Sequence, residues 1–304
     1  MIPKILIARY STPQTFMDEY NEAAKEVGVD IDYAMWEEIV VDTKAKDLKE
    51  LLKVKGKPLG NYDLVYVRTV QDKYYELTQL VNVATALGIR VVDKNLSHGS
   101  RVGDLKIHQI TQAAINGIPV PRTIYATDTT LLDKSDEFNS WPLVLKVMGL
   151  HRGQGVMLVE NKKEIRAKMD SFLQTKESKN FLLQEVIDYV ADYRIFVIGE
   201  RVVGGIQRIP QKGEFRANIA RGGTAKEIKE IPDKLRDLAL KACRVMELDI
   251  SGVDFMEDKN GNYLLTEVNR APQYEGLMQA TGIDIRVEII KYLKELVTNA
   301  KKSN

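Results

Sequence analysis

The sequence lacks several features that point to particular classes of protein. It has one cysteine, Cys243, in 304 residues, which excludes an intramolecular disulfide framework and a cysteine-rich metal site. Its three histidines, His98, His108 and His151, are placed together by no motif. No apolar run reaches the roughly 20 residues of a membrane span, and Met1 leads into a strand pattern rather than a signal peptide. We therefore expect a cytoplasmic protein without a membrane partner.

Charge of one sign does not dominate the chain either, since 44 lysines and arginines stand against 43 aspartates and glutamates. No field of the whole chain favours nucleic acid as a partner. The hydrophobic fraction of 44% and the charged fraction of 29% are ordinary for a globular protein. The length allows about two or three domains.

The first 95 residues alternate between strand and helix patterns. Strands are predicted at 4–8, 31–35, 63–67 and 89–93, and helices at 15–27, 43–54 and 74–87. Gly28 and Gly88 end two of these helices, as glycine often does at a helix C-terminus. Short connections between alternating elements predict a mostly parallel α/β sheet covered on both faces.

Two further units are predicted after this N-terminal domain of residues 1–95. The central unit, 96–180, begins with a helix at 106–116 and holds two apolar strands around a glycine-rich loop, followed by a helix at 162–173. The C-terminal unit, 181–304, is rich in strands in its middle and ends in a helix from residue 284. This pattern predicts α+β units, the last with an antiparallel sheet backed by helices.

A hairpin at 252–269, GVDFMEDKNGNYLLTEVN, carries most of the chemistry. Asn260-Gly261 favours a tight two-residue turn, and that turn places Asp254 opposite Glu267 and Gly252 opposite Asn269. Because side chains alternate along a strand, one face is predicted to hold Asp254, Met256, Leu265, Glu267 and Asn269. The core face would then hold Val253, Phe255, Leu264, Thr266 and Val268.

Opposed carboxylates destabilise a hairpin unless positive charge lies between them. Two carboxylates and an amide oxygen suit a hard divalent cation such as Mg²⁺ or Mn²⁺, so Asp254, Glu267 and Asn269 are candidate metal ligands. A solvated hairpin rim is the alternative interpretation of the same acids.

Two basic segments of the chain could bind an anion. Lys146 lies in an apolar strand just before Gly149, Gly153 and Gly155, and such a loop could close over phosphates. The GK[ST] ending of a Walker A loop is missing, and an ordinary exposed hairpin is the alternative. Residues 207–223 gather several arginines, which suits a triphosphate; a solvated loop and a nucleic-acid site are alternatives, although aromatics are scarce there.

The order of these motifs resembles the ATP-grasp superfamily, and most of all the RimK-type carboxylate–amine ligases that add glutamate to the end of a ribosomal protein. The motifs that carry the resemblance are Lys106 before GIPVP, Lys146 before the glycine-rich loop, Gln184-Glu185, Asp192 in ADYRIFVIG, EFRANIARGG, GVDF and TEVNRAP. The resemblance covers about residues 95–285. It implies an ATP-grasp fold, with an N-terminal Rossmann-like α/β domain and two α+β subdomains that sandwich ATP.

The resemblance also implies the roles of individual residues. The ATP-binding residues would be Lys106, Lys146, Gly153, Gly155, Gln184, Glu185, Val186, Ile187, Asp192, Arg216 and Asn218, with Asp192 near the ribose. Arg208, Arg216 and Asn218 would be catalytic, and Asp254, Glu267 and Asn269 would hold a pair of Mg²⁺ ions. The substrate would contact Arg68, Arg221, Arg270 and Tyr274.

The implied reaction is ATP-dependent amide formation through an acylphosphate. The expected partners are ATP, an amino acid such as glutamate, and a carboxylate on a peptide, a protein or a small molecule; a homo-oligomer is also expected. The segment from Arg270 to Gly276 departs from relatives that have glycine after proline, and it leaves the substrate open. An ATP-grasp kinase acting on a hydroxyl, or a nonenzymatic ATP-binding scaffold, are the alternative functions.

Overall fold

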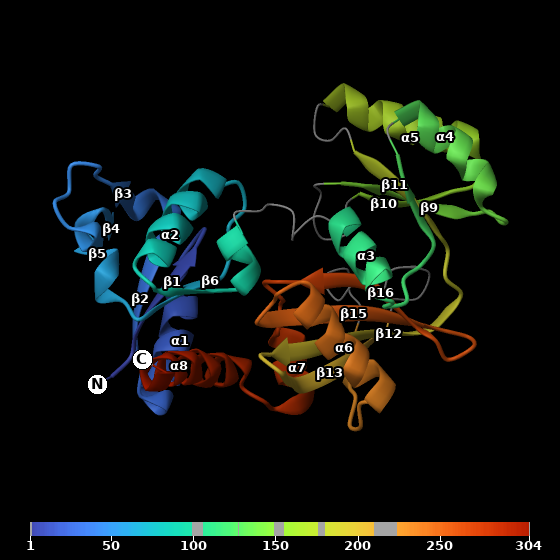
Figure 1. Cartoon of the computed structure of the whole chain (residues 1–304). Helices are drawn as coiled ribbons and strands as arrows, with labels where there is room; N and C mark the ends of the chain where they lie inside the picture. The colour runs from blue at the N-terminus through green and yellow to red at the C-terminus, as the bar shows by residue number, and fades with distance from the viewer. Residues whose placement is uncertain are drawn as a thin grey trace.

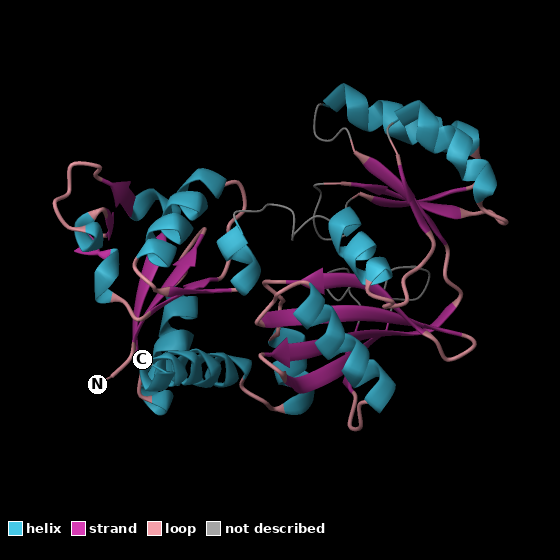
Figure 2. Cartoon of the chain, viewed as in Figure 1, coloured by secondary structure: helices cyan, strands magenta, loops and turns pink. Residues whose placement is uncertain are grey.

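The computed structural model describes residues 2–98, 106–126, 128–148, 155–175, 180–209 and 224–303. Within these residues the strands form four sheets, each packed against helices (Figures 1 and 2). No helix in this part of the chain is both long and apolar enough to cross a bilayer.

The N-terminal strands form a parallel sheet in the order β2-β1-β6-β7. Its elements are β1 (Lys4–Arg9), α1 (Gln14–Val27), β2 (Asp30–Met35), β6 (Leu64–Val67), α2 (Tyr74–Ala86) and β7 (Arg90–Val92). Ile5 and Ile7 face one core cluster while Leu6 and Ala8 face another, so both faces of the sheet are covered. The predicted parallel α/β sheet is confirmed, and Gly28 caps α1 with φ of 75°.

The helix predicted at residues 43–54 is wrong. This stretch contains η2 (Leu48–Glu50) and β4 (Leu52–Val54), and β4 pairs with β3 (Ile39–Val41) and β5 (Lys57–Pro58) in a small antiparallel sheet. Two further short helices, η1 (Trp36–Glu38) and η3 (Leu59–Asn61), flank the sheet. Leu52 and Val54 are fully buried around a partly exposed Lys53, so the period of two prevails over the helical pattern.

The central sheet is antiparallel, in the order β10-β9-β11-β8. Its strands are β8 (Thr123–Tyr125), β9 (Leu143–Val147), β10 (Val156–Val159) and β11 (Phe181–Glu185). The helices α4 (Asp128–Lys134) and α5 (Lys162–Thr175) cover one face, where Leu131, Ile165 and Met169 are buried. The sequence predicted α5 but no helix at α4.

The large sheet is antiparallel, as predicted, in the order β14-β13-β12-β15-β16. Its strands are β12 (Tyr189–Ile198), β13 (Arg201–Ile209), β14 (Thr224–Glu227), β15 (Ile250–Asp258) and β16 (Tyr263–Asn269). One face packs against α6 (Asp233–Val245) and against α3 (Lys106–Ile115) through a core that includes Val253 and Phe255. Figure 1 shows α3 between this sheet and the central sheet.

The opposite face of the large sheet is divided along β12. Phe196 and Ile198 enter the core of the N-terminal sheet together with α7 (Glu275–Thr281) and α8 (Ile285–Ser303). Arg194 and Asp192 lie further along the same face and are polar. One end of this face therefore joins the N-terminal domain, and the other end is available for chemistry.

The last helix, α8, packs beside α1 and the parallel sheet (Figure 1). Its Lys294 donates a hydrogen bond of 2.6 Å to the carbonyl of Val27, and its Lys301 forms an ion pair of 2.8 Å with Asp63. Residues from the two ends of the chain therefore share one core.

Asp93, which follows β7, joins the N-terminal sheet to β15. Its Oδ1 accepts hydrogen bonds of 2.9 Å from the backbone N–H groups of Asp249 and Ile250. Burial raises the pKa of Asp93 to about 7, although Arg270 acts in the opposite direction. The short helix η4 (Lys94–His98) follows, and the backbone N–H of its first residue donates a 3.0 Å hydrogen bond to the Asp249 carboxylate.

The raised pKa of Asp93 predicts a pH-dependent stability. Between about pH 4 and pH 7 the folded chain keeps a proton that the unfolded chain has lost, so the free energy of unfolding decreases as the pH rises. Asp93→Asn cannot lose this proton, and urea unfolding should show roughly 1 to 4 kcal/mol less decrease over this range.

Asp63→Asn is the matched control, because Lys301 and the Lys4 backbone lower the pKa of Asp63 against the effect of burial. Its contribution to stability is lost only as the pH falls below the usual range of aspartate. Parallel pH profiles for Asp93→Asn and the unchanged chain would contradict the prediction for Asp93.

Candidate functional site

The turn of the hairpin is one residue longer than predicted. Asp258 and Asn262 close it: the backbone N–H of Asp258 donates to the Asn262 carbonyl, and the N–H of Gly261 donates to the Asp258 carbonyl, each at 3.0 Å. The Asp258 side chain also accepts from the N–H groups of Asn260 and Asn262. Gly261 alone has positive φ in this loop, which fits a three-residue loop that ends in a left-handed residue.

A β-bulge at Thr266 compensates for the longer turn. Phe255 pairs with Leu265, and the register shifts before Asp254 pairs with Glu267. Thr266 is left between the two pairs, and its hydroxyl donates 3.2 Å to the Asp254 carbonyl. Asp254 opposite Glu267 and Gly252 opposite Asn269 are therefore confirmed.

The faces predicted for Leu264 and Leu265 are wrong, because the register on the turn side of the bulge differs by one residue. Leu265 is 2% exposed and belongs to the core with Phe255, whereas Leu264 pairs with Met256 and is only partly buried. A slip of one residue exchanges the two faces of a strand.

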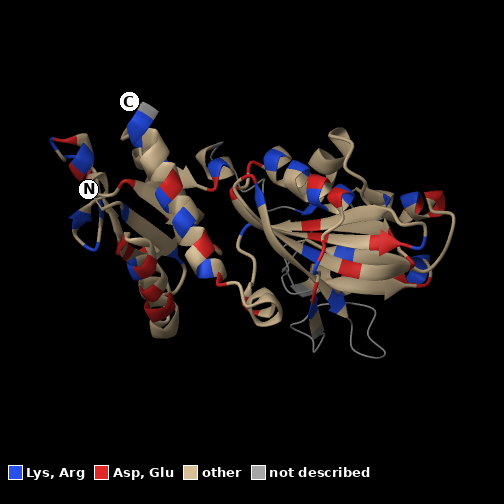
Figure 3. Ribbon diagram, turned by 90° about the horizontal axis from the view of Figure 1, so that it is seen from below, with Lys and Arg blue, Asp and Glu red and all other residues tan. Residues whose placement is uncertain are grey.

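A row of charged residues crosses three strands of the large sheet. Arg194 of β12 is the register partner of Asp254 of β15, which is the partner of Glu267 of β16. Arg194 Nε and Nη2 each donate a 2.7 Å hydrogen bond to one Asp254 carboxylate oxygen, a bidentate pair. Asp254 is 3% exposed. Figure 3 shows basic and acidic residues interleaved on the strands of this sheet.

Arg208 of β13 adds a second cation to the row. Its Nη1 lies 3.0 Å from Asp254 Oδ2, and its Nε donates a 2.6 Å hydrogen bond to Asp192 Oδ1. Burial opposes ionisation of Asp254, but Arg194 and Arg208 outweigh it and lower the pKa of the carboxyl. Burial raises the pKa of Asp192 to about 6 although Arg208 acts in the opposite direction.

Lys106 lies on the other side of the row and forms an ion pair with Glu267. Lys106 is the first residue of α3, and Gln109 one turn later fixes this helix to β16. Gln109 Nε2 donates 2.8 Å to the Val268 carbonyl, and the Val268 N–H donates 3.1 Å to Gln109 Oε1. Gln109 thereby completes the edge strand next to Glu267, a role that the sequence did not suggest.

Lys146 of β9, a strand of the central sheet, lies close enough to Lys106 and Glu267 to interact with their charges. Its pKa falls to about 8, because burial disfavours the charged form and the Lys106 ammonium repels it, whereas Glu267 acts in the opposite direction. The structure therefore gathers both predicted lysines and Glu267 from three separate elements. Gly155, also predicted, is buried, and its carbonyl accepts a 2.8 Å hydrogen bond from Val147.

Four of the predicted ATP-binding residues lie at the end of β11 and in its connection to β12: Gln184, Glu185, Val186 and Ile187. Gln184 is buried and donates a 2.8 Å hydrogen bond to Thr123 Oγ1, and Glu185 Oε1 accepts one of 2.6 Å from the Arg122 N–H. Val186 is 43% exposed and Ile187 is partly buried. Gly153, Arg216, Asn218 and Arg221 lie outside the described residues.

The segment after β16 is held against the carboxyl edge of the parallel sheet. Arg68 Nη2 donates 2.7 Å to the Pro272 carbonyl, and Arg270 Nη1 donates 2.9 Å to the Val67 carbonyl. The Arg68 guanidinium lies 5.4 Å from the centre of the Tyr274 ring. A Cβ added to Gly252 would lie 2.9 Å from Pro272 Cβ, so glycine allows this segment to touch the hairpin.

The donor set of the hairpin fits a hard cation. Asp254 and Glu267 face each other, and the Asn269 amide lies 3.4 Å from Asp254 Oδ2; oxygen donors of this kind suit Mg²⁺. In the part of the chain that the structure describes, no third carboxylate, histidine or thiol joins them. From the sequence we expected a metal ion to supply the positive charge next to the two carboxylates. In the structure this charge comes from Arg194, Arg208 and Lys106.

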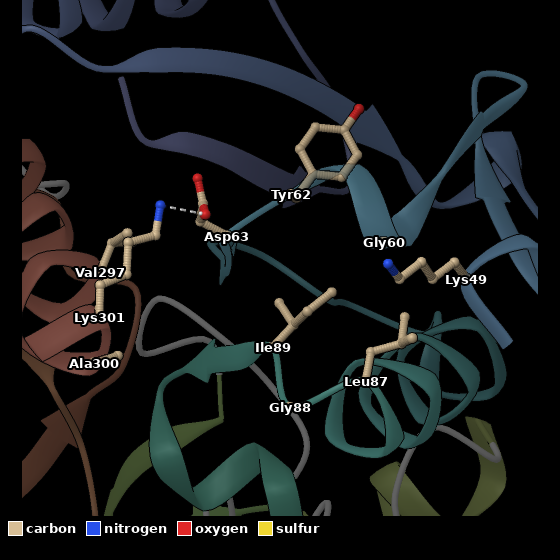
Figure 4. Close-up of a pocket in the computed structure, with 10 residues that line it drawn as sticks. All are labelled: Lys49, Gly60, Tyr62, Asp63, Leu87, Gly88, Ile89, Val297, Ala300 and Lys301. Carbon is tan, nitrogen blue, oxygen red and sulfur yellow. Dashed lines mark ion pairs between the residues drawn. The ribbon is translucent and has the colours of Figure 1, made fainter. Parts of the chain in front are cut away.

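A cavity of about 260 Å³ lies elsewhere, at the amino edge of the parallel sheet. Figure 4 shows Asp63 and Ile89, which precede β6 and β7, beside Lys301 of α8, with the Asp63–Lys301 ion pair drawn. Ligands of open α/β sheets bind at the carboxyl ends of the strands. This cavity therefore plays no part in the candidate site.

Comparison with known sequences points to one family. The profile of the RimK-like ATP-grasp domain matches residues 103–293. A probable alpha-L-glutamate ligase of Trichodesmium erythraeum is 32% identical over 255 residues, 83% of each chain. A probable alpha-L-glutamate ligase 2 of Hahella chejuensis is 36% identical over 214 residues, 70% of this chain and 69% of the relative.

Solved structures share the fold at low sequence identity. The ATP-grasp ligase PsnB, complexed with minimal precursor, Mg and ADP, superposes with a TM-score of 0.73 at 18% identity over 97% of both chains. The VanG D-Ala:D-Ser ligase of Enterococcus faecalis gives a TM-score of 0.69 at 15% identity, covering 98% of this chain and 100% of VanG. The ATP-grasp fold predicted from the sequence is confirmed.

The row of charges predicts strong coupling between Arg194 and Asp254. In protein free of nucleotide and metal, Arg194→Met should lower the free energy of unfolding by about 3 to 5 kcal/mol, because a buried carboxylate loses its bidentate partner. Adding Asp254→Asn should recover part of this loss. The free energies are measured by urea unfolding.

Arg201→Met is the control, since Arg201 forms only a 3.8 Å pair with Glu288 and its side chain is 53% exposed; a change of about 0 to 1 kcal/mol is expected. Additive losses for Arg194→Met and Asp254→Asn would show that the two residues are not coupled.

Proposed function

The chain belongs to the RimK-like ATP-grasp family and is an ATP-dependent ligase, and from this premise we propose that it attaches an amino acid, glutamate first among the candidates, to a carboxylate of a peptide or protein. The names of the curated relatives support glutamate. The precursor peptide complexed with PsnB supports a peptide as the acceptor.

One observation carries the proposal: Lys106, Lys146 and Arg208 converge from three elements on the Asp254–Glu267 pair. Transfer of a phosphoryl group needs charge neutralisation and positioning rather than a protein nucleophile. In our proposal the two lysines and Arg208 contact the phosphates of ATP. Asp192 holds Arg208 in position, in addition to the ribose contact predicted for it.

The base of ATP is assigned to the connection between the central and large sheets. Gln184, Glu185, Val186 and Ile187 offer backbone groups there, and Glu185 and Gln184 are fixed by Arg122 and Thr123. The phosphates then point along the sheets toward Lys146 and Glu267. Gly153 and Gly155 would close over the phosphates, and Arg216 and Asn218 would reach the reacting atoms.

The metal ligands in this proposal are Asp254, Glu267 and Asn269. Mg²⁺ bound with ATP would neutralise phosphate charge during transfer. Arg194 keeps Asp254 ionised and oriented, and Lys106 orients Glu267 through their ion pair. A pair of ions and a homo-oligomeric assembly are further predictions.

The proposed reaction has two steps. An oxygen of the substrate carboxylate attacks the γ-phosphorus, the bond to the β–γ bridging oxygen breaks, and ADP leaves an acylphosphate behind. The amine of the amino acid then attacks the acyl carbon, orthophosphate leaves, and the amine loses a proton as the amide forms. The chain's part is to position both substrates and to keep water from the acylphosphate.

The first test removes one carboxylate charge. Glu267→Gln should abolish ADP release while the protein stays folded, because Lys106 loses its partner and the metal loses a ligand. Glu257→Gln, on the same hairpin but paired with Tyr193, is the control and should keep its turnover. ADP and orthophosphate are measured with a panel of amino acids and peptide acceptors, and products are identified by mass spectrometry.

Unchanged turnover in Glu267→Gln would contradict the metal assignment. If the product is a phosphorylated hydroxyl and neither an amide nor orthophosphate is formed, the activity is that of a kinase rather than a ligase.

The second test uses the lowered pKa of Lys146. Lysine binds phosphate in its charged form, so the affinity for a nonhydrolysable ATP analogue should fall as the pH rises past about 8. Lys146→Arg should retain affinity and lose this pH dependence, because arginine stays charged. Lys146→Met should bind roughly 10- to 100-fold more weakly at pH 7.

Isothermal titration between pH 7 and pH 9 measures these affinities. Lys162→Met is the control, because Lys162 pairs with Asp136 on the outer side of the central unit. Equal affinities for Lys146→Met and Lys162→Met would exclude a phosphate contact by Lys146.

A further inference from the structure

A pair of arginines lies at the carboxyl edge of the parallel sheet, and the described part of the chain offers it no counter-ion. Arg9 is the last residue of β1, and Arg68 follows β6 directly, in the position next to the Ala8–Val67 register pair. The Arg68 N–H donates 2.8 Å to the Ala8 carbonyl, which keeps the strands in register up to the two arginines. The carboxyl ends of two adjacent parallel strands therefore both carry a cation.

Neither arginine is neutralised within the described residues, where no carboxylate lies within ion-pair distance of Arg9 or Arg68. Arg68 is 8% exposed and Arg9 is half-buried. Burial, and then the charge of Arg68, lower the pKa of Arg9. Two neighbouring cations that are partly or fully buried repel each other, and removing them from water without an anion costs free energy.

Part of their hydrogen-bonding capacity is also unused. Arg9 Nε and Nη1, Arg68 Nη1 and the hydroxyl of Tyr66 are buried and find no hydrogen-bond partner among the residues that the structure describes. Tyr66 lies two residues before Arg68 on β6 and pairs with Ile7, two residues before Arg9, so all three side chains share one face of the sheet. Buried donors in native proteins are rarely left unpaired without a functional reason.

The two guanidinium groups are nevertheless held in place. Arg9 stacks on the Phe16 ring with 3.7 Å between the guanidinium carbon and the ring centre. Arg68 is fixed by the Pro272 carbonyl and faces the Tyr274 ring. Stacking and one backbone contact orient the planar forks and leave N–H groups for a further acceptor.

We propose that Arg9, Arg68 and Tyr66 bind the α-carboxylate of the amino acid that supplies the amine. This carboxylate takes no part in the reaction. Two forks and a hydroxyl match the planar acceptor geometry of a carboxylate. This assignment rests on the proposed function, and it names the side of the reaction that the N-terminal sheet serves.

The position of the pair supports a substrate rather than ATP. Pro272, which Arg68 holds, lies against Gly252, the register partner of Asn269 in the hairpin. In the proposed function the phosphates of ATP would be met by Lys106, Lys146 and Arg208, which gather at Asp254 and Glu267, two residues further along the same face of that hairpin. Because Phe16 and the Pro272–Tyr274 segment contact the pair closely, a small free molecule fits better than the middle of a peptide chain.

The test compares Arg9→Met, Tyr66→Phe and the exposed control Arg166→Met in the full chain. Arg9→Met should raise the KM for L-glutamate by roughly 10- to 100-fold, with the affinity for ATP unchanged. Its ligand-free form should melt at a higher temperature than the unchanged chain, since an unpaired cation is removed. A structural arginine would give the opposite change in melting temperature.

Tyr66→Phe keeps the result interpretable if Arg9→Met folds poorly. The hydroxyl has no hydrogen-bond partner within the described ranges of the chain, so its loss should leave the melting temperature unchanged and weaken glutamate binding several-fold. Binding of L-glutamate and of γ-aminobutyrate, which lacks the α-carboxylate, is measured by titration in the presence of a nonhydrolysable ATP analogue.

The outcomes separate the two proposals. If no amino acid supports ADP release, the proposed function fails, and the titration still decides whether the arginines bind a carboxylate. If the unchanged chain is active but Arg9→Met and Tyr66→Phe behave like Arg166→Met in KM and titration, the carboxylate site is excluded. Displacement of L-glutamate by inorganic phosphate at equal concentration would replace the carboxylate by a phosphate ligand.

Discussion

The pair of opposed carboxylates on the β15–β16 hairpin is the constraint on which the site depends. Asp254 and Glu267 repel each other across the strands, and the fold answers with Arg194 and Arg208 on one side and Lys106 on the other. The row is therefore stable without ATP or a metal ion. In the proposed function, their binding would exchange partners within an arranged set of charges instead of creating an ionic site from solvated side chains.

Much of this site could be predicted from the sequence because its logic is local. Alternation along two strands and an Asn-Gly turn were enough to place Asp254 opposite Glu267, although the turn is longer and the bulge at Thr266 restores the register. The longer turn shifts the register only between the turn and the bulge. For this reason only the strand faces predicted for Leu264 and Leu265 are wrong. The site side is unaffected.

The missed residues depend on contacts between distant segments. Arg194 matters because β12 lies beside β15, and Gln109 because α3 covers the free edge of β16; neither neighbour follows from spacing in the sequence. The helix predicted at 43–54 failed for a similar reason, since Leu52 and Val54 are buried by a small sheet and by Trp36. The spacing of the charged residues within 43–54 does not indicate that packing.

The core shared by α8 and the parallel sheet has a consequence for the order of folding. Ile5 and Tyr20 are buried together with Ile290 and Leu293, so the first domain made by the ribosome lacks part of its interior until residues 285–303 have been made. Domains usually fold as they are synthesised. Here the half that carries Arg9 and Arg68 would be completed last, together with the end of the large sheet that Phe196 and Ile198 add to the same core, so a chain that stops before α8 would lack an ordered edge for this pair of arginines.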